Sequence, residues 1–285
     1  MTAMSTDKGS SNARVSTFSQ IRIIMKYSFL NYFRARRFYV MLTIVLLISG
    51  LLTFAFAYFR PAGILGGTAV GFYGAGWGSF VTLIVILSTA LFGGDAISSE
   101  FQNRTGYFLV PNPLRRSAIY VGKWFAALAA SSIILVVYAL IILANGMYYF
   151  PWTVPSEFIQ SAIFAWVFLI AALSLMFAFS SLFKSSAISI LMGIMLLLII
   201  FNVIDEVATA LAGIEPWFSI TYADGIIANV LMAPYPMHHT TTPVGRFTIS
   251  MFNATIPEGL AIMAVYFVVA AIIGLWLFER KEFTS

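Results

Sequence analysis

The sequence predicts an all-α integral membrane protein with six transmembrane helices, and three observations lead to this prediction. Hydrophobic residues make up 60% of the 285 residues and charged residues only 9%, against about 25% charged in an average soluble domain. Six apolar segments each approach the length of about 20 residues that a helix needs to cross a hydrocarbon core about 30 Å thick. Lysine and arginine gather in alternate loops between these segments, as in proteins that cross a membrane several times.

The chain begins with a polar stretch and continues with an amphipathic one. Residues 1–17 are rich in Ser, Thr and Asn and lack aromatic residues, so we expect a disordered cytoplasmic tail. Residues 18–37 predict a helix with an aromatic and aliphatic side and a basic side. Such a helix lies in the membrane interface with its cations towards anionic headgroups, and we favour this over a polar extension of the first span. The basic side carries Arg22, Lys26, Arg34 and Arg37.

The remaining residues, 38–285, form the predicted six-helix transmembrane domain. Its spans are residues 38–58, 72–93, 124–144, 158–179, 187–204 and 259–278. Glycines at the start of the second span disfavour a helix there, so we expect a flexible entrance. No Asp, Glu, Lys, Arg or His lies in the middle of any span, although such residues mark ion pathways in pumps and transporters. A secondary transporter driven by an ion gradient is therefore disfavoured.

The distribution of basic residues predicts the orientation, because basic residues next to a span resist translocation. One set of loops carries 14 of the 16 Lys and Arg residues, and the other set carries only Arg60 and Arg246. We therefore predict a protein of the plasma membrane with both termini and the 94–123 loop in the cytoplasm. The net charge of +5 is explained by this bias, and we expect no nucleic-acid partner.

The 94–123 loop contains a compact polar element that is more elaborate than a connector requires. Asp95 can cap the first free amides of a short helix, and Glu100 and Arg104 have the i,i+4 spacing of a helical ion pair. Ile97 and Phe101 share another face of that helix. These features predict a docking surface for a soluble partner.

The second half of this loop predicts a turn and a return to the membrane. Gly106 ends the short helix, and Pro111 and Pro113 force a non-helical turn because each lacks an amide donor and makes the preceding residue extended. Arg115 and Arg116 then lead into the third span. These two arginines either contact acidic groups of a partner or lipid phosphates, or they serve only to keep this end of the span on the cytoplasmic side.

For the longest loop on the other side, residues 205–258, the sequence is compatible with two structures. Its apolar middle, 216–232, forms either short helices that enter the outer leaflet or a loop on the membrane surface. Methionines near His238 and His239 suggest copper, since thioether and imidazole suit that metal. Adjacent histidines in a loop rich in Thr and Pro are more often solvated, so we predict no metal site.

No enzymatic site is expected in this chain. Gly122 and Lys123 are followed by Trp124 rather than Ser or Thr, and Ser117 stands where the phosphate-binding loop requires glycine. An intramembrane hydrolase would need a base near a buried nucleophile, and neither histidine is placed to serve. The chain is thus predicted to be a passive membrane subunit that receives energy from elsewhere.

The polar loop also resembles a known family. The order Gly94-Asp95-x-Ile97-Ser98-x-Glu100, then Arg104-Thr-Gly106, Pro111-x-Pro113-x-Arg115 and Gly122-Lys123, resembles the first cytoplasmic loop of type-2 ATP-binding-cassette (ABC) exporter permeases. The resemblance implies an N-terminal elbow helix, a coupling helix between the second and third spans, and often re-entrant helices before the last span.

The resemblance also implies partners and residue roles. Two permease copies, or this permease with a related one, pair with two ATPase subunits that bind ATP and Mg²⁺, and this chain itself binds no cofactor. Asp95 and Glu100 would stabilise the coupling helix, Ile97 and Phe101 would contact the ATPase, and Arg115 and Arg116 would meet acidic groups or lipid. A membrane receptor or anchor that moves nothing is the main alternative function, and a secondary transporter the weaker one. Nothing in the sequence selects a substrate.

Overall fold

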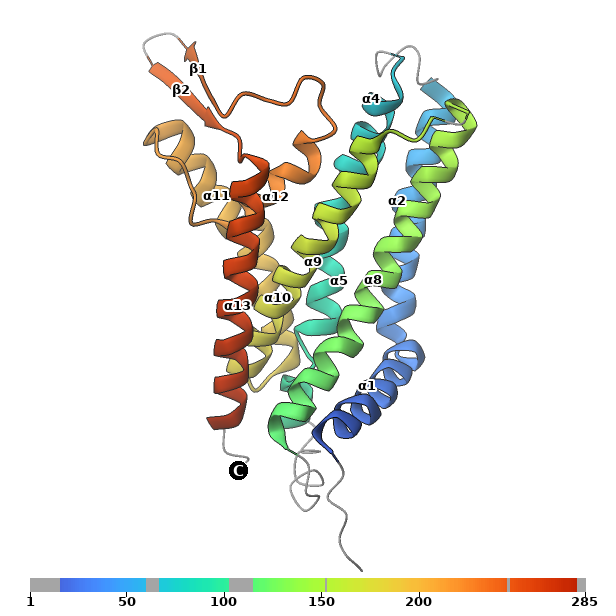
Figure 1. The fold of residues 1–285 in the computed structure, drawn as a ribbon, viewed down its shortest axis with the longest axis vertical. Helices are drawn as coiled ribbons and strands as arrows, with labels where there is room; N and C mark the ends of the chain where they lie inside the picture. The colour runs from blue at the N-terminus through green and yellow to red at the C-terminus, as the bar shows by residue number, and fades with distance from the viewer. Residues whose placement is uncertain (1–15, 60–66, 103–114, 152, 245–246, 281–285) are drawn as a thin grey trace, which may run out of the picture.

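The structure, a computed structural model, describes residues 16–59, 67–102, 115–151, 153–244 and 247–280. Long helices run side by side from one end of the molecule to the other (Figure 1). Among the described residues, six helical segments are long and apolar enough to cross a membrane, which confirms the predicted all-α membrane fold. They are Arg36–Phe59, Ala69–Glu100, Arg116–Tyr149, Ser156–Leu182, Ser186–Leu211 and Ile256–Arg280.

The N-terminal helix α1 (Thr17–Arg34) lies obliquely across the lower end of the bundle (Figure 1). The Ser16 hydroxyl caps it by accepting a hydrogen bond from the Ser19 amide at 3.3 Å. Ala35 then adopts an extended backbone, so α2 (Arg36–Phe59) starts in a new direction. The interfacial helix was predicted to cover residues 18–37, but in the structure it ends at Arg34, and Arg37 belongs to α2.

The second and fourth spans form the centre of the bundle. The second consists of α4 (Ala69–Tyr73), the π-helical η1 (Gly74–Gly78), α5 (Val81–Gly93) and, beyond a turn, α6 (Ser98–Gln102). The third span is α8 (Arg116–Tyr149), and the fourth is α9 (Ser156–Leu182). In their most apolar stretches, 72% of the second span and 61% of the fourth are buried, against 22% of α2. The outer spans therefore present apolar side chains to lipid or to another chain.

The glycine-rich start of the second span is packed within the protein, and does not form the flexible entrance expected from the sequence. Tyr138 donates a hydrogen bond to the Gly76 carbonyl at 2.5 Å, inside the π-helical turn. The neighbouring Trp77 is fully buried, and its indole Nε1–H donates to Ser161 Oγ at 2.9 Å. Ser161 in turn donates to the Ile227 carbonyl at 2.5 Å. This chain of hydrogen bonds joins the second span, the fourth span and the helix that contains Ile227.

Replacing Ser161 with alanine is expected to lower the free energy of unfolding by about 1–3 kcal/mol. The substitution removes the partner of the buried Trp77 indole and a donor to the Ile227 carbonyl. Thermal unfolding of the purified protein in detergent measures the effect. The Ser156→Ala variant is the control, because Ser156 is exposed and its hydroxyl donates to the adjacent Glu157 carboxylate at 3.2 Å. Equal stability of the two variants would contradict this prediction.

The fifth span is longer than predicted. It runs through α10 (Ser186–Met195), η2 (Leu196–Ile200), α11 (Phe201–Glu206) and η3 (Val207–Leu211). The sequence analysis placed the end of this span at residue 204 and assigned Asp205 to the following loop. In the structure the Ser219 and Thr221 hydroxyls donate to Asp205 Oδ2 at 2.8 and 2.6 Å. Because its carboxylate has these partners, Asp205 stays in the helix, and the loop begins after Leu211.

The region before the last span contains a helix and an unexpected β-hairpin. Helix α12 (Ile220–Asn229) lies within the apolar 216–232 stretch and is mostly buried against neighbouring helices. Strands β1 (His239–Val244) and β2 (Phe247–Phe252) pair antiparallel, with His239 opposite Phe252. The hairpin lies at the end of the bundle opposite α1 (Figure 1). The last span, α13 (Ile256–Arg280), follows it.

Candidate functional site

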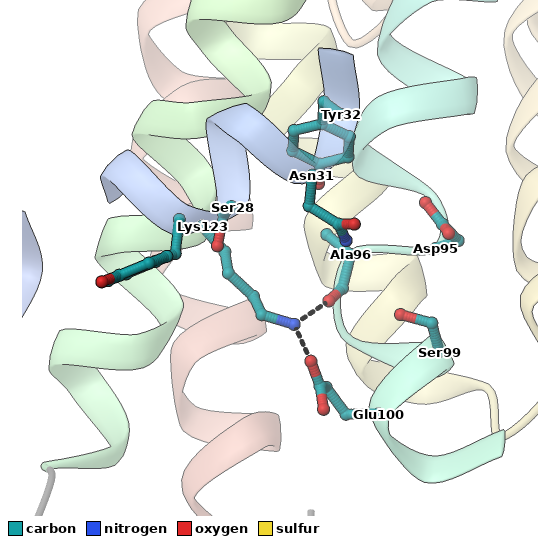
Figure 2. A pocket seen from close by; sticks show the side chains of 9 residues that line it. Ser28, Asn31, Tyr32, Asp95, Ala96, Ser99, Glu100 and Lys123 are labelled. Atoms are coloured by element: carbon teal, nitrogen blue, oxygen red, sulfur yellow. Dashed lines mark hydrogen bonds and ion pairs between the residues drawn. The ribbon is translucent and has the colours of Figure 1, made fainter. Parts of the chain in front are cut away.

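The predicted docking element lies at the same end of the bundle as α1. The segment from Gly94 to Gln102 forms a turn and then the short helix α6, which contacts α9 and α10. A pocket of about 350 Å³ opens here (Figure 2). Its lining combines one side of α1 with the turn, α6 and one residue of α8: Tyr27, Ser28, Asn31, Tyr32, Asp95, Ala96, Ser99, Glu100 and Lys123.

A hydroxyl from the fourth span caps the beginning of α6. Ser180 Oγ accepts hydrogen bonds from the Ile97 amide at 2.9 Å and the Ser98 amide at 3.0 Å. Free amides at the start of a helix need such acceptors. The sequence assigned this cap to Asp95, and the structure corrects that assignment, because the Asp95 carboxylate pairs with another residue. The cap therefore ties α6 to α9, two elements that are far apart in the sequence.

Lys123 of α8 holds α6 through two contacts, which Figure 2 shows as dashed lines. Its ammonium donates to the Ala96 carbonyl at 2.8 Å and forms an ion pair with Glu100. The Lys123 and Glu100 side chains are only 13% and 19% exposed, so little water competes for the pair. The predicted partner of Glu100 was Arg104, which lies outside the described residues. Lys123 was recognised in the sequence only as part of a Gly-Lys pair.

Arg37, at the start of the first span, forms an ion pair with Asp95. The Asp95 side chain is only 9% exposed, so this guanidinium compensates a largely buried carboxylate. The structure thus differs from the expectation that Arg37 faces lipid headgroups. Arg22, Lys26 and Arg34 are exposed on α1, and their role at a membrane surface stays a prediction.

The fifth span also contacts α6. Gln102 Oε1 accepts a hydrogen bond from the Ser186 amide at the start of α10, at 3.0 Å. Ser98 is fully buried, and its hydroxyl donates to the Gly94 carbonyl at 3.2 Å and lies 3.4 Å from Ser186 Oγ. Neither Gln102 nor Ser186 was predicted as a site residue, because a polar residue at a helix end has many ordinary uses.

Tyr32 of α1 closes the inner side of the pocket. Its hydroxyl donates to the Phe92 carbonyl near the end of α5 at 2.8 Å. Burial raises the pKa of the Tyr32 phenol above its ordinary value, although the nearby Arg37 opposes the shift. The phenol therefore stays protonated and keeps donating across the physiological pH range. This bond fixes α1 against the second span.

The two arginines at the start of α8 contact neighbouring helices through different groups. The backbone amide of Arg115 donates to Gln20 Oε1 on α1 at 3.2 Å. The Arg116 guanidinium donates to the Glu279 carbonyl at the end of α13 at 2.8 Å. A cation at the C-terminal end of a helix is favourable, because the last carbonyls there carry partial negative charge. Arg116 thus links the third span to the sixth.

One predicted site residue has a different environment from the one expected, and several others lie outside the residues that the structure describes. Ile97 is fully buried within this chain, so the structure corrects the prediction that its side chain faces a partner. The Phe101 side chain lies outside the described residues, as do Arg104, Gly106, Pro111 and Pro113. Glu100 and the polar side of α6 remain as the described part of the predicted docking surface.

In the part of the chain that the structure describes, six helical segments are long and apolar enough to cross a membrane. A short helix at one end of the bundle is bonded to the third, fourth and fifth of them. This is the architecture of a multi-pass membrane protein. The family model described as ABC-2 family transporter protein matches residues 22–283, and the chain belongs to this family. It is the membrane permease of an ABC transporter, a multi-pass protein that is not itself the ATPase. A comparison with curated proteins gives no match.

Proposed function

We propose that this permease works in an ABC exporter and receives the energy of ATP hydrolysis through α6. Membership of the family implies an ABC ATPase partner. In our proposal two ATPase subunits, which hold ATP and Mg²⁺, dock beneath α6 of two permeases. The second permease is another copy of this chain or a related one. Export, as opposed to import, is inferred from the resemblance of the 94–123 loop to that of type-2 exporters.

The anchoring of α6 is the observation that carries this proposal. Lys123 bonds α6 to α8, Ser180 caps it from α9, and Gln102 contacts α10. The turn before α6 is further paired with α2 through Arg37. Because interiors are closely packed, a displacement of α6 by an ATPase would move the ends of several spans together. A receptor that only holds a partner does not require such connections.

The proposed orientation places α6, α1 and both termini in the cytoplasm. In Figure 1, α1 and the end of α13 lie at the same end of the bundle as α6. Fourteen of the 16 basic residues belong to the loops and termini that we assign to this side. Positive charge next to spans favours the cytoplasmic side. The exposed basic residues of α1 would then contact anionic headgroups, as an interfacial elbow helix does.

Purification of the chain from its native membrane in mild detergent tests the proposal. We expect an ABC ATPase to co-purify and to hydrolyse ATP. The Glu100→Lys variant places a cation beside Lys123 and is expected to release most of the ATPase. The Glu157→Lys variant makes the same charge change in the first turn of α9, at the end of this helix opposite Ser180, and is expected to retain the ATPase. An isolated permease without ATP turnover, even with the ATPase gene expressed, would favour a receptor or anchor.

A further inference from the structure

Three acidic and imidazole side chains meet at the end of the bundle opposite α6. Glu215 follows η3, His238 immediately precedes β1, and Glu258 lies in the first turn of α13. One potential ligand atom from each residue lies within 4.8 Å of the other two. The sequence drew attention to His238 as a neighbour of His239 and of methionines. The fold instead brings it to two carboxylates from segments far away in the chain.

The tautomer of His238 is fixed by a hydrogen bond outside this cluster. His238 Nδ1 lies 2.9 Å from the Asn253 carbonyl, which can only accept, so Nδ1 carries the proton. In the neutral ring, Nε2 then presents its lone pair to Glu215 Oε1 at 3.4 Å. A lone pair and a carboxylate repel unless a proton on Nε2 or a metal cation lies between them. A histidine that binds a metal commonly donates its other ring N–H to a carbonyl in this manner.

The spacing of the ligand atoms suits a tetrahedral ion. Zn²⁺ binds imidazole nitrogen and carboxylate oxygen at about 2.0–2.2 Å, so two ligand atoms of a tetrahedral site are about 3.3–3.5 Å apart. The 3.4 Å between His238 Nε2 and Glu215 Oε1 falls within this range. A carboxylate oxygen of Glu258 lies within 4.8 Å of one of Glu215. Like charges this close disfavour each other, so a proton or a cation between the two carboxylates is favourable.

The surroundings hold the three side chains in place. Tyr222 donates a hydrogen bond to Glu215 at 2.6 Å, and the Thr255 amide donates to Glu258 Oε2 at 3.2 Å. The Asn253 amide donates to the His238 carbonyl at 2.8 Å, so His238 and Asn253 are bonded twice. Outer hydrogen bonds of this kind orient metal ligands. The His238 side chain is 44% exposed, which leaves a path for an ion from solvent.

We propose that Glu215, His238 and Glu258 bind a divalent first-row metal ion of the Zn²⁺ type. Three protein ligands leave the fourth position for water. The ion joins the segment after the fifth span, the segment before the hairpin and the first turn of the last span. It therefore stabilises the end of the bundle at which α13 begins. This inference is independent of the proposed coupling through α6.

Binding of Zn²⁺ to the full chain, stripped of metal with a chelator in detergent, tests the proposal by calorimetry. We expect one ion per chain and a higher melting temperature with Zn²⁺, and no such effect with Mg²⁺, which prefers oxygen ligands in an octahedron. The His238→Gln variant is expected to bind Zn²⁺ about 100-fold more weakly or worse. The His239→Gln variant is the matched control, because His239 stacks on Phe252 outside the cluster and should leave binding unchanged.

A spectroscopic measurement separates loss of the site from loss of the fold. Co²⁺ in a tetrahedral site gives visible absorption bands, and these should appear in the wild-type chain and in the His239→Gln variant. The bands should be absent from the His238→Gln and Glu215→Gln variants. Cooperative melting without metal shows that a variant is folded. If one of the two variants does not fold, the spectrum of the other one tests the site. The proposal is overturned if wild-type protein binds no Zn²⁺, or if His238→Gln and His239→Gln bind it equally well.

Discussion

Replacing Lys123 with methionine should lower the free energy of unfolding by about 2–3 kcal/mol. This is less than the cost of breaking a fully buried ion pair, because the Lys123 and Glu100 side chains are partly exposed. Methionine retains the apolar stem but removes the ammonium. The ion pair between Lys123 and Glu100 is then lost, and the Ala96 carbonyl loses a donor. Because α6 is no longer held to α8, we also expect transport driven by ATP to fall about tenfold or more, equivalent to about 1.4 kcal/mol. Unfolding in detergent and transport in proteoliposomes measure the two effects.

A double-mutant cycle distinguishes the ion pair from a general loss of charge. The Glu100→Gln variant leaves Lys123 without its anion, and the double variant Lys123→Met with Glu100→Gln removes both charges. We expect the losses to be non-additive by about 1–3 kcal/mol, because the residues are in contact. The Lys26→Met variant controls for removal of an exposed lysine, since Lys26 lies on the outer side of α1. Additive losses, or equal effects at Lys26 and Lys123, would contradict this account.

Replacing Gly122 with alanine should separate α1 from α8. A Cβ atom at Gly122 would lie 2.9 Å from Cβ of Ile24 and 3.0 Å from the Ile21 carbonyl oxygen. Both neighbours belong to α1, and a backbone oxygen cannot move without moving the helix. Overpacking of this kind costs about 1–3 kcal/mol. We therefore expect lower thermal stability and faster proteolysis of α1.

The Gly50→Ala variant is the matched control for Gly122→Ala. Gly50 is exposed within α2, and a Cβ atom there would meet no atom within 4 Å. Alanine is about 0.8–1.0 kcal/mol more favourable than glycine in a helix, so this variant should be as stable as the wild type or more so. If both glycine variants were equally stable, the close contact between α1 and α8 would not contribute as described.

The number and positions of the spans were predictable because long apolar segments have few alternatives to a membrane helix. The ends of the spans were less predictable. The fifth span was predicted to end before Asp205, but this residue stays in the helix, where the hydroxyls of Ser219 and Thr221 donate to its carboxylate. These partners are adjacent only in the folded chain. The hairpin was missed for a similar reason: Thr240–Thr242 and the strand 247–252 have β-branched and aromatic residues, but their pairing is decided by the fold.

The position of the docking element was predictable from its polar residues, but most of its contacts were not. Local spacing suggested Asp95 as the cap and Arg104 as the partner of Glu100. Ser180 supplies the cap from another span, and Lys123 forms the described ion pair. Capping and i,i+4 spacing predict contacts only between residues within about one helical turn. In a helical bundle, the strongest partners of a loop lie on other helices. Ile97 was read as exposed for the same reason.

Cross-linking through α6 tests the central claim most directly, because the chain has no cysteine of its own. Gln102→Cys places a thiol on the exposed last residue of α6, and Met237→Cys places one on an exposed residue before the hairpin. We expect the Gln102→Cys variant to cross-link to the ATPase in membranes, with a yield that changes when ATP binds, and the Met237→Cys variant to give no such product. An ATPase that co-purifies with the permease yet cross-links to neither variant, or equally to both, would contradict docking at α6.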